Sequence, residues 1–345
     1  MTRRAVTFED RAEISAGLKA GWTVSRIAED LGRSKSVISR EVKRNKPSGV
    51  GGYRPVVADQ RAADRRKRPQ TRKIDRDPTL LARVRADLRR SRTPRQVAGR
   101  LTLEATEPTL DLMEHSLPAD GATVSHEALY RWIYAMPKGE LARSGILLRS
   151  RRTARKQRRP LGERTGGRIV GMVSIEDRPE QATDRRMPGW WEGDLIVGEG
   201  GKSAAATLVE KTSLFTLILA LPQGKKADGV ADVLIDHLEG LPKFMRAGLT
   251  WDQGTEMARH ASVTVAADLP IYFAHPHSPW ERPTNENTNG LIREYLPKGT
   301  HITSSQLYLD QIAHELNERP RASLGFYTPR EVFERLLREN VASTG

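Results

Sequence analysis

A run of basic residues over 143–168 constrains the fold of this chain more than any other feature. The run holds ten Arg or Lys residues and a single acid, Glu163. Such a segment cannot bury enough apolar surface to fold alone, so it divides the 345-residue chain into separate parts. We expect it to be an Arg-rich linker that lies along a polyanion, with Arg151, Arg152 and Arg155 among the contacts.

Charge differs sharply between the two parts. Residues 1–168 carry 39 Lys or Arg against 19 Asp or Glu, a net charge of +20, whereas residues 169–345 carry 18 against 24, a net charge of −6. A basic first part predicts binding to nucleic acid, and an acidic second part predicts chemistry that needs carboxylates. The alternative is a basic surface that serves only solubility.

The sequence excludes cysteine chemistry and a membrane-spanning segment. The chain has no Cys, which rules out disulfides, thiolate metal sites and cysteine nucleophiles. Its N-terminus has no apolar run of signal-peptide length. No stretch approaches the roughly 20 consecutive apolar residues that a membrane span needs. We therefore expect a cytoplasmic protein without a membrane partner.

Residues 1–46 have the pattern of three short helices. Thr7, Thr23 and Ser34 are N-cap candidates, and Gly21 and Gly32 end the first two helices. The short turn before the third helix predicts a helix-turn-helix DNA-binding domain, with a plain three-helix bundle as the alternative. The outward face of the third helix would present donors for phosphates and base edges: Lys35, Ser36, Ser39, Arg40 and Lys43.

The next stretch contains a second helical unit. Residues 47–78 lack a regular apolar period and are predicted to be a basic linker. Residues 79–142 contain two helix starts, Thr93 followed by Pro94, and Ser125 before HEALYRWIYA. This unit is either a second helix-turn-helix-like DNA-binding domain or a purely structural helical module.

From residue 169 to 345 the pattern changes to that of a sheet. WWEGDLIVGE, KSAAATLVEKT and LFTLILALP read as three consecutive strands, and AGLTWDQG and PIYFAH as two later strands separated by helical segments. Two further helices end the chain. The order predicts an α/β domain with a mixed five-stranded sheet.

Three carboxylates stand at positions suited to chemistry. Asp194 lies inside the first predicted strand, Asp252 follows the fourth, and Glu286 opens a helix after the last. An Asp in an apolar strand is costly unless its charge is compensated, and oxygen ligands suit Mg²⁺ or Mn²⁺. Two such ions can assist displacement at a phosphodiester.

Spacing alone leaves other acids open. The competing carboxylates are Glu192, Glu256, Glu281 and Glu294. His275 and His277 are a weak indication of a zinc pair, because an H-x-H sequence in a loop has low specificity.

The motifs resemble a known family over most of the chain. WEGD, TWDQGTE and SPWERPTNENTNGLIREYLPKGT closely resemble the core of DDE transposases of the IS-thirty family of bacterial insertion sequences. SRIAEDLGRSKSVISREVKRN resembles the first helix-turn-helix of that family, and TPRQVAGRL with VSHEALYRWIY resembles the second. The resemblance implies a ribonuclease-H-like fold, shared with retroviral integrases, for residues 169–345. By position, Asp194, Asp252 and Glu286 fall on the catalytic triad of the family.

The resemblance also implies an activity. Such a protein binds the terminal inverted repeats of its own element, cleaves the ends and transfers the 3′ strands to target DNA with two Mg²⁺ or Mn²⁺ ions. We expect a homodimer or larger assembly on double-stranded DNA, associated with the bacterial nucleoid. Glu286 would be the mobile third ligand of the ions. The neighbouring side chains expected to brace the site or contact DNA are Asn285, Asn287, Asn289, Arg293 and Lys298.

One residue departs from the family pattern. Pro283 stands where the family usually has Gly, and the fixed φ of proline restricts the backbone before the helix. This substitution favours one alternative, a transcriptional regulator whose ribonuclease-H-like domain is inactive. The other alternative is a structure-selective nuclease that cuts DNA and never joins strands.

Overall fold

The computed structural model describes residues 5–45, 52–67, 72–137, 143, 169–182, 185–276 and 278–342. The chain divides into two compact units, Met1–Arg72 and Lys73–Gly345. Several residues singled out in the sequence lie outside the described ranges: Arg151, Arg152, Arg155 and His277.

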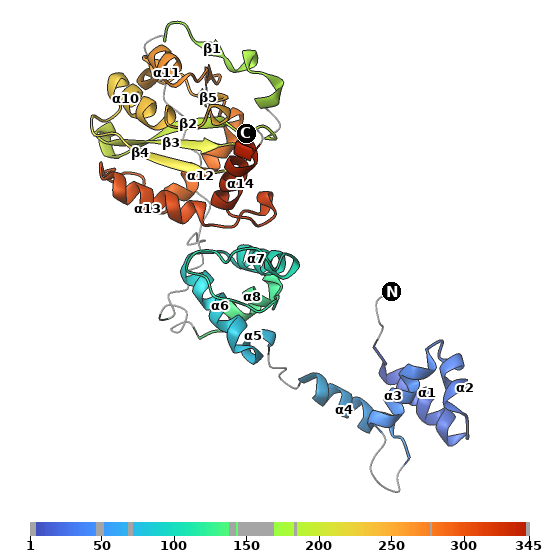
Figure 1. Cartoon of the computed structure of the whole chain (residues 1–345). Coiled ribbons are helices and arrows are strands. Elements are labelled where there is room, and N and C mark those ends of the chain that lie inside the picture. Colours follow the sequence, from blue (N-terminus) through green and yellow to red (C-terminus); the bar gives the residue numbers. More distant parts are fainter. Residues whose placement is uncertain are drawn as a thin grey trace. The chain divides into compact units, whose positions relative to one another are not determined.

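The first unit begins with three short helices, α1 (Phe8–Lys19), α2 (Val24–Asp30) and α3 (Lys35–Asn45) (Figure 1). The side chains of Thr7 and Thr23 accept hydrogen bonds from the backbone at the starts of α1 and α2, as their positions predict. Helices α1 and α2 approach closely because Gly17 has no side chain. A Cβ there would lie 2.8 Å from the side chain of Ile27.

A fourth helix, α4 (Pro55–Lys67), lies where the sequence predicts a linker. Tyr53 and Ala58 join the core that α1, α2 and α3 form around Ile14, Ile27 and Ile38. An ion pair of 2.8 Å between Arg11 and Asp59 also connects α1 to α4. Helix α4 shows no apolar period because Ala58 is its only buried side chain among those that the structure describes.

The second unit starts with a helical module, defined here as residues 73–137. Its helices are α5 (Lys73–Arg76), α6 (Pro78–Arg89), α7 (Pro94–Thr106) and α8 (His126–Tyr134). Thr93 caps α7 with Pro94 in its first turn, and Ser125 caps α8, as predicted. Apolar side chains of α7 and α8 are buried together in one core: Val97, Ala98, Leu101, Leu129, Trp132 and Ile133.

The rest of the second unit is a sheet domain, residues 169–342. Its strands are β1 (Val173–Ser174), β2 (Trp190–Val197), β3 (Ala204–Glu210), β4 (Thr216–Ala220), β5 (Gly248–Trp251) and β6 (Ile271–Phe273). They are arranged in the order β1-β6-β5-β2-β3-β4. Strands β2, β3 and β4 form an antiparallel meander, and β5, β6 and β1 add on in parallel.

This arrangement confirms the predicted α/β domain with a mixed sheet, with one correction. The sheet has six strands rather than five. The additional strand, β1, is two residues long and therefore too short to show a period in the sequence.

Helices cover both faces of the sheet (Figure 1). Helices α10 (Ala227–Leu238), α11 (His260–Ala267) and α14 (Pro329–Ala342) contribute to a core on one face, and α12 (Pro283–Ile292) and α13 (Gln306–Asn317) to a core on the other. Phe333 of α14 stacks on Phe215 with ring centroids 4.2 Å apart and meets the edge of Trp191 in β2 at 6.3 Å. No described helix combines the length and apolar character needed to cross a membrane.

Candidate active site

Two of the three predicted acids lie in, or directly after, adjacent parallel strands. In the register of β2 and β5, Glu192 is level with Thr250. Advancing two residues along each strand brings Asp194 level with Asp252, which directly follows β5. Asp252 thus stands at the carboxyl end of its strand, where ligands of open α/β sheets collect.

Arg282 lies between these two carboxylates. Its Nη1 is 3.9 Å from Oδ1 of Asp194, and its Nη2 is 3.6 Å from Oδ2 of Asp252. Nη1 also donates to the carbonyl oxygen of Gly193 at 2.8 Å, which holds the guanidinium in place. No local pattern singles out Arg282, although it belongs to the same ERPTNEN block as Glu286.

The negative charge of the acid pair is compensated only in part. Burial raises the pKa of Asp194 to about 6, Arg282 opposes that rise, and the charges of Asp252 and Glu256 add to it. Oδ1 of Asp252 is buried and has no hydrogen-bond partner among the described residues. A buried carboxylate oxygen without a donor is the kind of atom that a hard divalent cation satisfies.

Glu192 differs from Asp194 and Asp252 because it accepts hydrogen bonds from the backbone of a helix. Its side chain is 1% exposed, and its Oε2 accepts hydrogen bonds from the backbone nitrogens of Thr284 and Asn285, both at 3.0 Å. These nitrogens belong to the first turn of α12, where backbone N–H groups lack partners within the helix. Glu192 therefore caps α12 and fixes it against β2.

Amide side chains on α12 continue this contact. Asn285 donates to the carbonyl oxygen of Glu192 at 3.1 Å, and Asn289 donates to Oδ2 of Asp194 at 2.9 Å. The hydroxyl of Thr207 on β3 lies 3.2 and 3.1 Å from the amide oxygens of Asn285 and Asn289. The donated bond of Asn289 orients the Asp194 carboxylate.

Glu286 and Asn287 occupy the exposed side of α12, whereas Thr284, Asn285 and Thr288 face the sheet. The backbone nitrogen of Glu286 donates the ordinary helical hydrogen bond to the carbonyl oxygen of Arg282 at 3.1 Å. The structure thus places Glu286 one residue after the anchored Asn285 and four residues after Arg282.

Sequence comparisons with known proteins identify the family of this chain. Residues 2–45 match a family model described as a helix-turn-helix domain. The chain is 40% identical over 334 residues to the transposase for insertion sequence element IS1086 of Cupriavidus metallidurans, which covers 95% of this chain and 94% of that protein. It is also 40% identical over 345 residues to transposase InsI for element IS30C of Escherichia coli, covering 96% and 85% of the two chains. The chain belongs to the IS30 family of transposases.

Among solved structures, this IS30-family chain is similar to the catalytic core domain of BIV integrase. The TM-score is 0.34 at 16% identity, over 44% of this chain and 98% of that chain.

Pro283 fits this IS30-family chain without distortion. It is the first residue of α12, where proline is well tolerated because the missing N–H would have no helical partner. The proline that the sequence places before the helix therefore lies inside it and helps to start it.

The basic residues predicted to meet DNA lie in two different settings. Lys298 is exposed, whereas Arg293 donates to the backbone carbonyl oxygens of Val197 at 3.1 Å and Leu296 at 3.3 Å. In the first unit of this IS30-family chain, all five predicted contacts of α3 are exposed: Lys35, Ser36, Ser39, Arg40 and Lys43.

The remaining competitor acids have protein partners. Glu281 accepts from Nδ1 of His275 at 2.8 Å, and Glu294 lies 3.5 Å from Arg319. Nε1 of Trp251 donates to Glu256 at 3.5 Å.

Proposed function

We propose that this chain is the transposase of its own insertion sequence. It binds the terminal inverted repeats, cleaves the DNA at the ends of the element and joins the freed 3′ ends to target DNA. The observation that carries the proposal is the acid pair Asp194–Asp252 on adjacent strands, with a buried and unpaired Oδ1 on Asp252. Membership of the IS30 family supports the same reading.

The acid pair and Glu286 together offer the oxygen ligands that hard cations prefer. Asp194, Asp252 and Glu286 would hold two Mg²⁺ or Mn²⁺ ions, since all three offer carboxylate oxygens. The bound ions would activate the attacking oxygen and stabilise the leaving oxygen of a phosphodiester.

The residues of the chain prepare this site in three ways. Asn289 orients Asp194, and Glu192 anchors the helix that carries Glu286. Before a cation binds, the positive charge of Arg282 lowers the repulsion between the two Asp carboxylates. Because Glu286 faces solvent from a helix rather than a strand, its carboxylate can adjust to the phosphate of the bound DNA.

Other parts of the chain bind the DNA. The exposed donors of α3 suit the major groove of the element end. The Arg-rich segment 143–168 suits the phosphate backbone, where contacts add affinity without sequence preference. Two element ends must be handled together, so the active assembly is a homodimer or larger, working on the DNA of the bacterial nucleoid.

Cleavage and joining of a labelled element-end duplex test the proposal. The wild-type protein with Mg²⁺ or Mn²⁺ is compared with Glu286→Gln and Asp252→Asn, and with Glu339→Gln as a matched change at an exposed Glu of α14. We expect joined products from the wild type and the Glu339→Gln control. The two site variants should lose at least about 10³-fold in rate, as expected when charged groups that act on the transition state are removed.

The same assay separates the two alternatives. Specific binding without cleavage by the wild type would identify a regulator. Cleavage of branched DNA without any joined product would identify a nuclease.

A further inference from the structure

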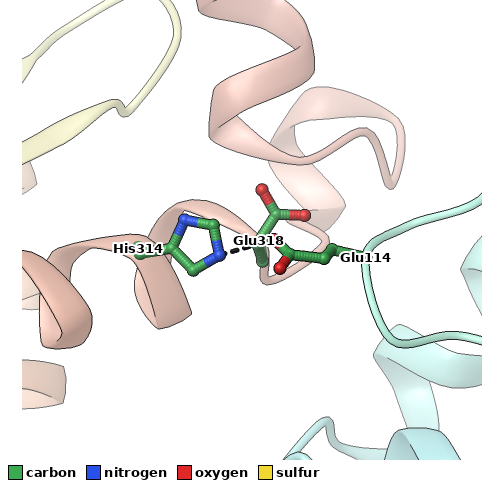
Figure 2. A group of neighbouring side chains, drawn as sticks. All are labelled: Glu114, His314 and Glu318. Carbon is green, nitrogen blue, oxygen red and sulfur yellow. Dashed lines mark ion pairs between the residues drawn. The ribbon is translucent and has the colours of Figure 1, made fainter.

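A second group of potential metal ligands lies outside the acidic site. Glu114, His314 and Glu318 each offer one ligand atom, and these atoms all lie within 4.8 Å of one another (Figure 2). Glu114 belongs to the segment between α7 and α8 of the helical module, whereas His314 lies on α13 and Glu318 ends that helix. The cluster therefore joins two parts of the second unit.

The ligand types and their spacing suit a zinc-class ion. His314 and Glu318 are four residues apart, which places them on one face of the helix. Nε2 of His314 lies 2.6 Å from Oε2 of Glu114. Imidazole nitrogen and carboxylate oxygen are both ordinary ligands of Zn²⁺, and three protein ligands leave a fourth position for water.

Glu318 supplies the independent observation. Its side chain is buried, and one of its oxygens is engaged by Nε of Arg330. Its other oxygen, Oε2, is buried and has no hydrogen-bond partner in the described part of the chain. Glu114 and His314 are partners for each other. Oε2 of Glu318 is left desolvated and without a hydrogen bond, which costs free energy.

Three nearby arginines pair with acids outside the cluster. The cluster opens onto a small pocket whose lining also includes Arg90, Arg92 and Arg319. Each of these guanidinium groups already faces an acid of its own. The partners are Glu315 for Arg90, Asp87 for Arg92 and Glu294 for Arg319.

We propose that Glu114, His314 and Glu318 bind one divalent transition-metal ion of the zinc class. The ion would satisfy Oε2 of Glu318, replace the direct contact between Glu114 and His314, and fasten the helical module to α13. This is a structural site, separate from the acid pair that we assign to catalysis.

Titration with Zn²⁺ in a calorimeter tests the proposal on the full-length chain. Asp194→Asn and Asp252→Asn are introduced together, so that the acid pair does not contribute to binding. We expect one tightly bound equivalent of Zn²⁺. Glu114→Gln, His314→Gln and Glu318→Gln should each weaken binding at least about 100-fold, because even outer partners of metal ligands are worth 10–100-fold.

Matched controls guard against a general loss of folding. His301→Gln and Glu339→Gln change exposed residues of the same types and should leave Zn²⁺ affinity unchanged. Zn²⁺ should also raise the unfolding temperature of the parent and control proteins, but not that of the three cluster variants.

Two results would overturn the proposal. One is the absence of a bound equivalent in the parent protein. The other is that His314→Gln keeps the Zn²⁺ affinity of the parent protein but lowers the unfolding temperature measured without metal. That result would show that the cluster is an ion pair and not a metal site. Neither result affects the proposed transposase activity, which is measured separately with Asp194 and Asp252 intact.

Discussion

Glu192 holds the backbone nitrogen of Asn285 at 3.0 Å, which ties a buried carboxylate of β2 to the first turn of α12. The bond explains why an acid two residues before Asp194 need not be a metal ligand. Glu192 acts as a positioning residue for the helix that carries Glu286.

Replacement of Glu192 separates positioning from metal binding. Glu192→Gln removes the charge that stabilises the helix start, so we expect a loss of about 1–3 kcal/mol in the free energy of unfolding. Affinity for Mn²⁺ should remain within about threefold, whereas Asp252→Asn should abolish it. Urea unfolding and Mn²⁺ titration measure the two effects, and loss of Mn²⁺ binding in Glu192→Gln would make Glu192 a ligand.

Arg282 competes with cations for the acid pair. Its guanidinium lies 3.9 Å from Asp194 and 3.6 Å from Asp252, so a bound ion meets a fixed positive charge. Arg282→Met should tighten Mn²⁺ binding about tenfold, or about 1.4 kcal/mol. Arg338→Met is the control, because this exposed guanidinium of α14 pairs with Glu334 and not with the acid pair. Equal Mn²⁺ affinity in Arg282→Met and wild type would contradict this view of Arg282.

A buried ion pair joins the helical module to the last helix. Arg100, which is fully buried, donates to both carboxylate oxygens of Glu331 at 2.7 and 2.6 Å. Arg100→Met removes the partner of both Glu331 and Glu104 and should cost about 3 kcal/mol in the free energy of unfolding. Glu331→Gln leaves Arg100 paired with Glu104 at 2.8 Å, so it should cost less, about 1–3 kcal/mol. The double variant should cost clearly less than the sum, which a double-mutant cycle in urea measures. Strict additivity would show that the two side chains act independently.

The pH dependence of stability should report Lys211. Burial, with a smaller contribution from Arg178, lowers the pKa of Lys211 to about 8. Lysine in the unfolded chain titrates near 10.4, so between these two pH values the unfolded chain binds more protons than the folded one. The contribution of Lys211 to stability therefore rises as pH increases through this window.

Comparison with Lys211→Met isolates this contribution. Between pH 7.5 and pH 10, the difference in unfolding free energy should move in favour of the wild type by about 1–3 kcal/mol. Urea unfolding at several pH values gives this difference directly. A difference that stays constant with pH would mean that Lys211 keeps an ordinary pKa.

The elements of the fold that the sequence predicted correctly have strong local signals. Thr93 and Ser125 cap helices whose apolar residues recur at helical spacing, and the five longer strands are apolar runs between turn residues. Helix α4 and strand β1 were missed for physical reasons. The first buries Ala58 alone among its described side chains, and the second is only two residues long.

The geometry of the candidate site depends on contacts that no local pattern encodes. The separation of 58 residues between Glu192 and Thr250 is a register between strands, and it is the same as that between Asp194 and Asp252. The sequence predicted Asp194 inside one strand and Asp252 at the end of another, but no local pattern predicted this register. For the same reason Arg282 went unnoticed, because its role depends on carboxylates that lie far away along the chain.

The stacking of Phe333 on Phe215 and against Trp191 has a consequence for the timing of activity during synthesis. Trp191 belongs to the strand that carries Asp194, so the core beneath this strand is completed only when α14 has left the ribosome. All residues of the helix-turn-helix unit precede residue 73, so they leave the ribosome long before α14 does. A growing polypeptide of this kind would therefore complete its helix-turn-helix unit well before the strand that carries Asp194 is fully packed.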